Sequence, residues 1–155
     1  MKKIALIGSG TSAIGFLVRL LQQSPKSILV DCFEQGKALQ ERIESNDVIT
    51  GFGGAGTFSD GKLSLSSEIG GDICDLIGIS KYEDYIQDVV QLWTRGKKVE
   101  KANLTDDKVK RLELDFRQNN LMLRLSDFYH IGTDLLQEVL AEIDEELKEK
   151  EDIVR

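Results

Sequence analysis

The amino-acid sequence predicts an α/β fold, and three observations near its start support that class. An apolar run at residues 4–7 leads into a glycine-rich turn, and apolar residues then recur at helical spacing over residues 11–23. A second apolar run follows at residues 27–33. Short continuous apolar runs are typical of strands buried in a parallel sheet. A strand, a helix and a second strand therefore predict a βαβ unit.

The composition fits one globular domain. The chain has 155 residues, of which 41% are hydrophobic and 30% charged. The net charge is −7 and no basic patch is present, so we expect no nucleic-acid partner. No stretch approaches the ~20 apolar residues of a membrane helix, so we expect no membrane span.

Targeting and metal signals are weak. The basic start and apolar run invite comparison with a secretory signal peptide, but glycine and serine interrupt the run and no A-x-A site follows. Cys32 and Cys74 form no CxxC motif, and the single histidine, His130, cannot form a histidine-rich metal site. We therefore expect a cytoplasmic protein without a metal, in which Cys32 is a small core residue on a strand.

The rest of the chain alternates between expected helices, loops and short strands. Helical periodicity, turn residues and alternation are the signals used. They predict helices at 37–43, from 80 to about 96, from about 105 to 119 and from 133 or 134 onward. They also predict a loop at 51–61, an exposed strand at 63–66, a strand at 121–125 and the beginning of a strand at 153–154.

The helix starts carry specific cap predictions. Ser80 and Glu83 have the spacing of a capping box, and Thr133 or Asp134 is expected to cap the last helix. Periodicity predicts which side chains face inward, namely Tyr82, Ile86, Val89 and Trp93, then Val109, Leu112 and Phe116, then Leu135, Leu136, Val139, Leu140, Ile143 and Leu147.

The turn between the first strand and the first helix has the pattern G-x-G-x-x-A. Gly8 permits the tight turn, Gly10 permits close approach of a pyrophosphate, and Ala13 keeps the helix near the strand. The free N–H groups and the dipole of the helix start favour phosphate. The candidate cofactor-binding residues here are Gly8, Ser9, Gly10, Thr11, Ser12, Ala13, Glu34 and Gln35.

An acidic residue completes this pattern. Glu34 follows the second strand, where the pattern expects a carboxylate that bonds a ribose hydroxyl. These features predict a partial Rossmann-like unit that binds an adenine dinucleotide without a 2′-phosphate. They are, in order, the strand, the glycines, the helix, the second strand and the acidic residue. These residues alone do not separate NAD from FAD, and a glycine turn without a ligand is the alternative.

A second glycine-rich segment extends over residues 51–63. Residues 56–62 match the first seven positions of a P-loop, but Leu63 replaces the hydroxyl residue that would hold magnesium. Dense glycine more readily forms an anion-binding nest, to which Thr57, Ser59 and Lys62 add donors. A mobile surface loop is the alternative, although Phe52 and Phe58 are unusual in a solvated linker.

Four features in order carry a family resemblance. They are G-S-G-T-S-A, the glutamate after the second strand, G-F-G-G-A-G-T-F-S-D-G-K-L, and Y-H-I-G-T-D. Together they resemble the amino-terminal part of a family of bacterial and archaeal FAD-dependent dehydrogenases with a glutathione-reductase-like flavoprotein fold. The resemblance covers essentially the whole chain. One departure is Ser9-Gly10-Thr11, where alanine-glycine-proline is more usual.

The resemblance implies FAD as the cofactor and assigns roles to both glycine-rich segments. The first turn would hold the pyrophosphate, and Glu34 would hold the adenosine ribose. His130, Gly132, Thr133 and Asp134 would lie near the flavin or on its substrate side. The residues that would line the flavin end are Gly53, Gly54, Ala55, Gly56, Thr57, Phe58, Ser59, Asp60 and Lys62.

The resemblance also implies an incomplete domain. Family members have several hundred residues, so we expect an amino-terminal fragment whose sheet lacks later strands and which a complementing chain could complete. Its expected parts are a βαβ unit at 1–36, a cofactor loop at 51–66 and a mainly helical part at 80–155 that ends as a strand begins.

Two functions follow from these expectations. The first is an FAD-dependent oxidoreductase that uses a nicotinamide or another electron donor. In it Lys62 would stabilise negative charge on reduced flavin and His130 would move a proton. A solvated Lys62 and a structural His130 are the simpler interpretations. The second function is a non-catalytic dinucleotide-binding module that needs a partner chain.

Overall fold

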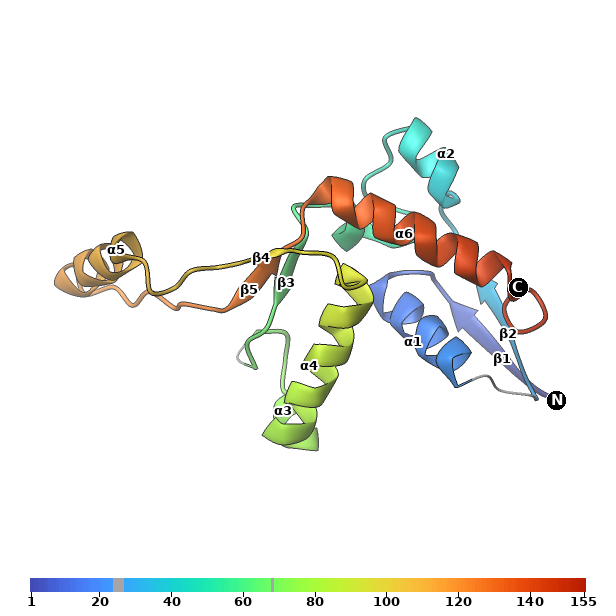
Figure 1. Ribbon diagram of the computed structural model, residues 1–155, viewed down its shortest axis with the longest axis horizontal. Coiled ribbons are helices and arrows are strands. Elements are labelled where there is room, and N and C mark those ends of the chain that lie inside the picture. Colours follow the sequence, from blue (N-terminus) through green and yellow to red (C-terminus); the bar gives the residue numbers. More distant parts are fainter. Residues whose placement is uncertain (24–26, 68) are drawn as a thin grey trace.

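The computed structural model describes residues 1–23, 27–67 and 69–155, and it has a mixed α/β architecture (Figure 1). A two-stranded parallel sheet lies near the termini, and a three-stranded antiparallel sheet lies in the middle of the chain. The helices are α1 (Thr11–Gln22), α2 (Leu39–Glu44), α3 (Ile73–Ile77), α4 (Ile79–Thr94), α5 (Asp107–Gln118), α6 (Thr133–Lys148) and the 3-10 turn η1 (Ala55–Phe58).

The predicted βαβ unit is confirmed. Strand β1 (Lys2–Ile7) pairs in parallel with β2 (Ile28–Phe33), in a register that runs from Lys2 opposite Ile28 to Ile7 opposite Phe33. Helix α1 connects the two strands, and the predicted helix stop at residues 24–26 lies outside the described residues. Val154 forms a parallel bridge with Val30, at the place where a strand was expected to begin.

Helices α1 and α6 pack against one face of the parallel sheet. Ile14 from α1, Val30 from β2, and Val139, Leu140 and Ile143 from α6 are fully buried together. The apolar spacing that predicted these helices therefore forms the core.

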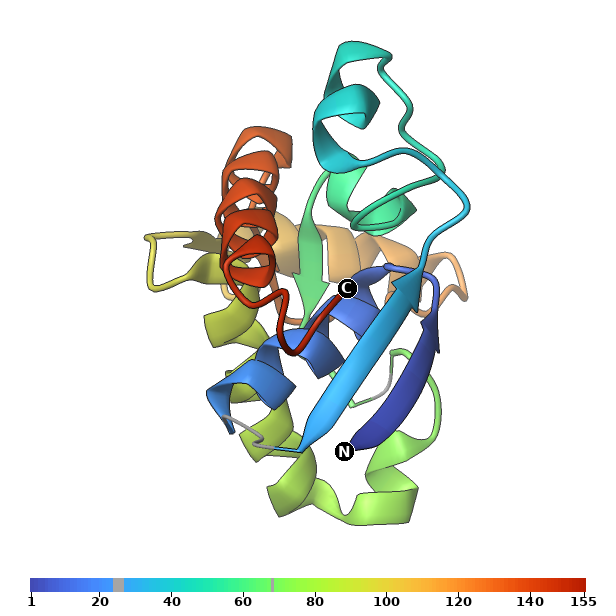
Figure 2. The same cartoon turned by 90° about the vertical axis from the view of Figure 1, so that its right-hand side faces the viewer.

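The opposite face of the parallel sheet is open. Figure 2 shows β1 and β2 with no helix in front of them. Ile7 and Phe33 are partners across the two strands and remain 80% and 57% exposed.

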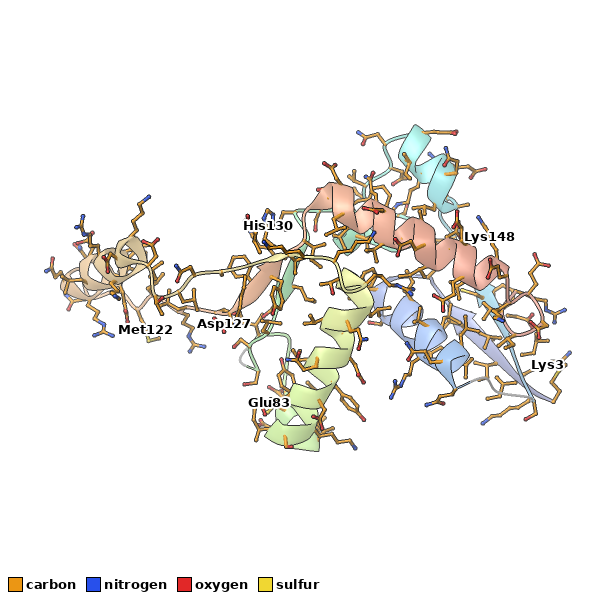
Figure 3. All side chains as sticks on the ribbon, in the orientation of Figure 1. Lys3, Glu83, Met122, Asp127, His130 and Lys148 are labelled. Atoms are coloured by element: carbon orange, nitrogen blue, oxygen red, sulfur yellow. The ribbon has the colours of Figure 1, made fainter. Side chains whose placement is uncertain are left out.

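The antiparallel sheet has the strand order β3-β5-β4. Strand β3 (Lys62–Ser64) pairs with β5 (Phe128–His130), which pairs with β4 (Glu100–Lys101). Between β4 and β5 the chain extends into an arm that carries α5 far from the other helices (Figure 1). Met122 lies on this arm (Figure 3).

The predicted strand at residues 121–125 is wrong. These residues have no strand structure, and Leu121 and Met122 are exposed. Their alternating pattern is typical of a strand, but a strand also needs a neighbour for its backbone hydrogen bonds. The arm provides no neighbour, whereas residues 128–130 lie between β3 and β4 and pair with both.

The predictions for α5 and for two helix caps need correction. Leu112 was expected to face inward, but it is 47% exposed, and no residue of α5 is buried because the arm leaves the core. Gly78 precedes α4 and Gly132 precedes α6, both at positive φ, so neither Ser80 nor Thr133 or Asp134 occupies the cap position. At both helix starts the chain enters the helix through a positive φ, which glycine adopts without strain.

Other boundaries shift by a few residues. The predicted helix at 37–43 is α2, the strand at 63–66 is β3, and the loop at 51–61 contains η1. Helix α3 and strand β4 had no clear signal in the sequence. Among the described residues, no helix is long and apolar enough to cross a membrane, and no group of three His, Cys, Asp or Glu side chains is placed to hold a metal ion.

Candidate functional site

The turn between β1 and α1 has the conformation that its glycines predict. Gly8 adopts a φ of 88°, and its N–H donates to the Phe33 carbonyl at 2.7 Å, which ties the turn to the end of β2. The first helical hydrogen bond of α1 runs from the Ile14 N–H to the Gly10 carbonyl at 3.0 Å. No side chain of the described residues caps this helix start. The N–H groups of its first turn therefore lack helical partners and carry the positive end of the dipole.

Gly10 has no structural need to be glycine within the described chain. Its φ is −70°, which any residue adopts, and a Cβ added there would meet no atom within 4 Å. By contrast, Gly53 has a φ of 93°, and a Cβ there would lie 2.6 Å from the Thr57 Oγ1. The bare backbone of Gly10 therefore faces open space, as a close approach by a ligand requires.

Glu34 contacts the same turn. Its Oε2 accepts from the Ser9 N–H at 2.8 Å and from the Ser9 hydroxyl at 2.7 Å, and its Oε1 accepts from the Gly36 N–H at 2.8 Å. The Gly36 N–H foremost, and the Ser9 donors after it, hold the pKa of the Glu34 carboxyl below its usual value, although partial burial opposes this. Glu34 is thus a fixed carboxylate at the carboxyl end of β2, as the pattern predicts.

The second glycine-rich segment lies against the first. The Gly53 N–H donates to the Ser9 carbonyl at 2.9 Å, and Gly10 and Gly53 form a parallel bridge. A Cβ on Gly54 would lie 3.2 Å from the Gly10 Cα. The two segments that the sequence singled out separately are therefore one continuous surface at the start of α1.

Two hollows adjoin these segments: Phe52 lines the first, and Gly56 and Thr57 line the second. The first, of about 470 Å³, is lined by Ser9, Glu34, Gly36 and Lys37, and also by residues of α6 and the chain end. The second, of about 460 Å³, is lined by polar Thr11, Ser12, Thr57 and Lys62 and by an apolar wall. That wall consists of Leu63, Val89, Leu92, Trp93, Ile131 and Leu136.

The other predicted site residues differ in their burial and in their contacts. Thr57 is buried and its hydroxyl donates to the Gly54 carbonyl at 3.1 Å. It therefore shapes residues 51–61 of the second glycine-rich segment, which we call the glycine loop. The Thr133 hydroxyl donates to the Ser59 carbonyl at 2.7 Å and joins the start of α6 to this loop. Gln35, Ala55, Gly56, Asp60, Asp134 and His130 are exposed, and Ala13, Phe58 and Gly132 are half-buried.

Lys62 and His130 are brought together. They are directly opposite each other in the β3–β5 ladder, so their side chains leave the same face of the sheet. Figure 3 shows His130 at the end of β5, beside the start of α6. The Lys62 Nζ lies 2.6 Å from the Asp60 Oδ2, and this contact is the main reason that the pKa of the exposed Asp60 carboxyl is lowered.

The P-loop interpretation does not fit this geometry. Its lysine should end a loop that opens a helix, whereas Lys62 begins strand β3.

Two residues of the site region were missed by sequence reasoning. Arg42 lies fully buried under the glycine loop, although the sequence shows it only as a charged residue of a short helix. Trp93 lines the second hollow, although its periodicity predicted only a core position. Arg42 follows Leu39 by three residues, so the two share one face of the helix, and this spacing was the available signal. In the structure both residues are buried.

Comparison of the chain with known protein families, with curated proteins and with solved structures finds no match. The geometry of the site and the sequence motifs are therefore the basis for a functional proposal.

Proposed function

We propose that this chain is a Rossmann-like FAD-binding module of an oxidoreductase, similar to the amino-terminal part of FAD-dependent dehydrogenases. The observation that carries the proposal is Gly10. Neither its φ nor its packing requires glycine, yet it stands at the start of α1, where free N–H groups and the helix dipole favour phosphate. A pyrophosphate that contacts the backbone here explains this residue.

The adenosine half of the cofactor fits the hollow at the end of β2. The Glu34 carboxylate is held there by Ser9 and Gly36. Its Oε2 already accepts two hydrogen bonds, both from Ser9, whereas its Oε1 accepts one from Gly36 and keeps a second lone pair. A ribose hydroxyl would donate to Oε1. The lowered pKa of Glu34 keeps the carboxylate an acceptor at neutral pH and disfavours a 2′-phosphate by charge repulsion.

The flavin half fits the second hollow. Its wall is mostly apolar, with Trp93 and Ile131 buried, and its polar lining includes buried Thr57 and exposed Lys62. A flat, mainly apolar ring with polar edges suits such a lining. The glycine loop, which lines part of both hollows, lets a ligand pass close to the backbone.

The residues at the rim suit redox chemistry. When bound, FAD would supply hydride and electron transfer, and a nicotinamide or another donor would supply the electrons. Lys62 would oppose negative charge at the rim, and His130, its cross-strand neighbour, would hold or move a proton at an imidazole nitrogen. The Lys62 ammonium already pairs with the Asp60 carboxylate at 2.6 Å, so negative charge on reduced flavin would compete with Asp60 for it.

Calorimetric titration tests the proposal. ADP, which contains the adenosine pyrophosphate portion, FAD and NAD are titrated separately into the purified chain. We expect ADP and FAD to bind, with FAD tighter because it also fills the second hollow. Absence of heat and of any shift in unfolding temperature with all three ligands would reject the proposed function.

A second candidate is a non-catalytic dinucleotide-binding module that a partner chain completes. Among the described residues, the outer edge of β1 has no neighbouring strand, and Ile7 on the open face is 80% exposed. Such an edge invites strand pairing. Binding of ADP and FAD without reduction of the bound flavin by NADH, together with self-association in size-exclusion chromatography, would favour this candidate.

A further inference from the structure

Arg42 is a fully buried cation beneath the glycine loop. Its side chain is 0% exposed, and it lies on α2. Its Nε donates to the Asp47 carbonyl at 2.8 Å, and its Nη1 donates to the Phe52 carbonyl at 2.7 Å. The guanidinium carbon lies 3.8 Å from the centre of the Phe58 ring. Arg42 therefore joins the two ends of the loop that carries Gly53 and Gly54.

Among the described residues, no carboxylate contacts the Arg42 guanidinium. The hydrogen bonds of Arg42 within this part of the chain go to backbone carbonyls, and its Nη2 atom is buried without an acceptor there. Burial lowers the pKa of Arg42, while the charges of Asp47 and Glu34 oppose that effect from a distance. A buried charge is costly to a folded chain unless hydrogen bonds and opposite charges offset that cost.

An anion at the phosphate-binding turn would add to the compensation that Asp47 and Glu34 give this charge. The Nη1 atom bonds the Phe52 carbonyl, and the next residue, Gly53, bonds Ser9 and bridges Gly10. One layer of glycine backbone therefore separates the guanidinium from the turn. Charges across such a layer are screened less than charges in water.

We propose that Arg42 is a positioning residue whose charge stabilises the phosphates of a nucleoside diphosphate bound at the turn, across the glycine loop and without direct contact. The inference rests on the proposed function. It differs from a purely structural role, since the benefit depends on the charge of the ligand. Removal of the charge should therefore weaken anionic ligands far more than neutral ones.

The experiment compares R42Q, which is neutral but keeps amide donors, with R42K, which keeps the charge but loses the planar fork. Affinities are measured for ADP by calorimetry and for adenosine by NMR titration. We expect R42Q to weaken ADP about tenfold and adenosine less than twofold. Tenfold is about 1.4 kcal/mol, comparable to two unit charges about 12 Å apart at an effective dielectric constant of about 20. R42K should stay within about threefold of the parent chain for both ligands.

The outcomes separate the two proposals. If the unmodified chain binds neither ADP nor FAD, the proposed function fails, and this inference fails with it. If the unmodified chain binds ADP but R42Q weakens ADP and adenosine equally, only the role of the Arg42 charge is rejected. If R42Q does not fold, R42K decides: unchanged affinities support a role of the charge, whereas a large equal loss of both affinities indicates a geometric role alone.

Discussion

Replacement of Gly10 by alanine separates ligand binding from folding at the first turn. The backbone of Gly10 already has a φ of −70°, and the new Cβ would meet no protein atom within 4 Å. The substitution therefore introduces neither strain nor a clash within the described chain. It changes only the space in front of the turn.

The expected magnitudes follow from these contacts. At the N-cap position, alanine is less favourable than glycine by ~1 kcal/mol. Alanine also lowers the conformational entropy of the unfolded chain, which stabilises the folded variant by about 0.4–1 kcal/mol. The unfolding temperature should therefore change by no more than about 4 °C. If the methyl group prevents one charge-assisted hydrogen bond to phosphate, about 1.5–3 kcal/mol is lost, which lowers ADP affinity roughly 10- to 150-fold.

The assay combines thermal unfolding with calorimetric titration of ADP. Gly15→Ala is the matched control for ADP, because its added Cβ would lie at an ordinary 3.8 Å from the Leu92 side chain, and Gly15 lines the hollow proposed for the flavin, which ADP does not fill. In the α1 interior it should raise stability by up to ~1 kcal/mol and leave ADP affinity unchanged. Unchanged ADP affinity in Gly10→Ala would refute the reasoning, as would an unfolded variant, since the geometry predicts neither.

Two further predictions concern pH and the core. The pKa of Glu34 is lowered in the folded chain, so its contribution to stability is present above the ordinary pKa of about 4.3 and is lost as pH falls through the folded pKa. The difference in unfolding free energy between the parent chain and Glu34→Gln should therefore shrink between about pH 5 and pH 3. A difference that stays constant in chemical denaturation over this range would contradict the prediction. Ile143→Ala removes a 0% exposed side chain from α6 and should lower the free energy of unfolding by about 2–5 kcal/mol. Leu76→Ala, at an 84% exposed position, should change it by no more than ~0.5 kcal/mol. Similar urea midpoints for the two variants would disprove the described core.

The sequence predicts local structure best where periodicity, turn chemistry and burial agree. The βαβ unit is such a place, because β1, α1 and β2 each have a continuous apolar face, and Gly8 has the positive φ that its turn requires. The carboxylate of Glu34 also lies at the predicted strand end. Each of these signals depends on residues close together in the chain.

Predictions failed where the outcome depends on distant segments. Residues 121–125 alternate as a strand does, but the arm offers no neighbour, so the strand forms at 128–130 instead. Leu112 has helical spacing on α5, yet the helix extends away from the core and leaves it exposed. Periodicity shows which residues could face a core, but not whether a core is adjacent.

The candidate site shows the same division. Both glycine segments are evident from residue type and spacing, but their contact through Gly53 and Ser9 is a tertiary feature. Lys62 and His130 lie far apart in the chain, and only the pairing of β3 with β5 makes them neighbours. The burial of Arg42 likewise depends on the loop that folds over it.

The fluorescence of Trp93 tests the central claim most directly. Trp93 is the chain's only tryptophan, and it lines the hollow proposed for the flavin. If FAD binds as proposed, added FAD should quench the emission of Trp93 in a saturable way, through energy transfer to the nearby flavin. ADP added in excess should displace FAD and restore the emission. Emission that FAD leaves unchanged, or quenching that ADP does not reverse, would contradict the proposal that one dinucleotide spans both hollows.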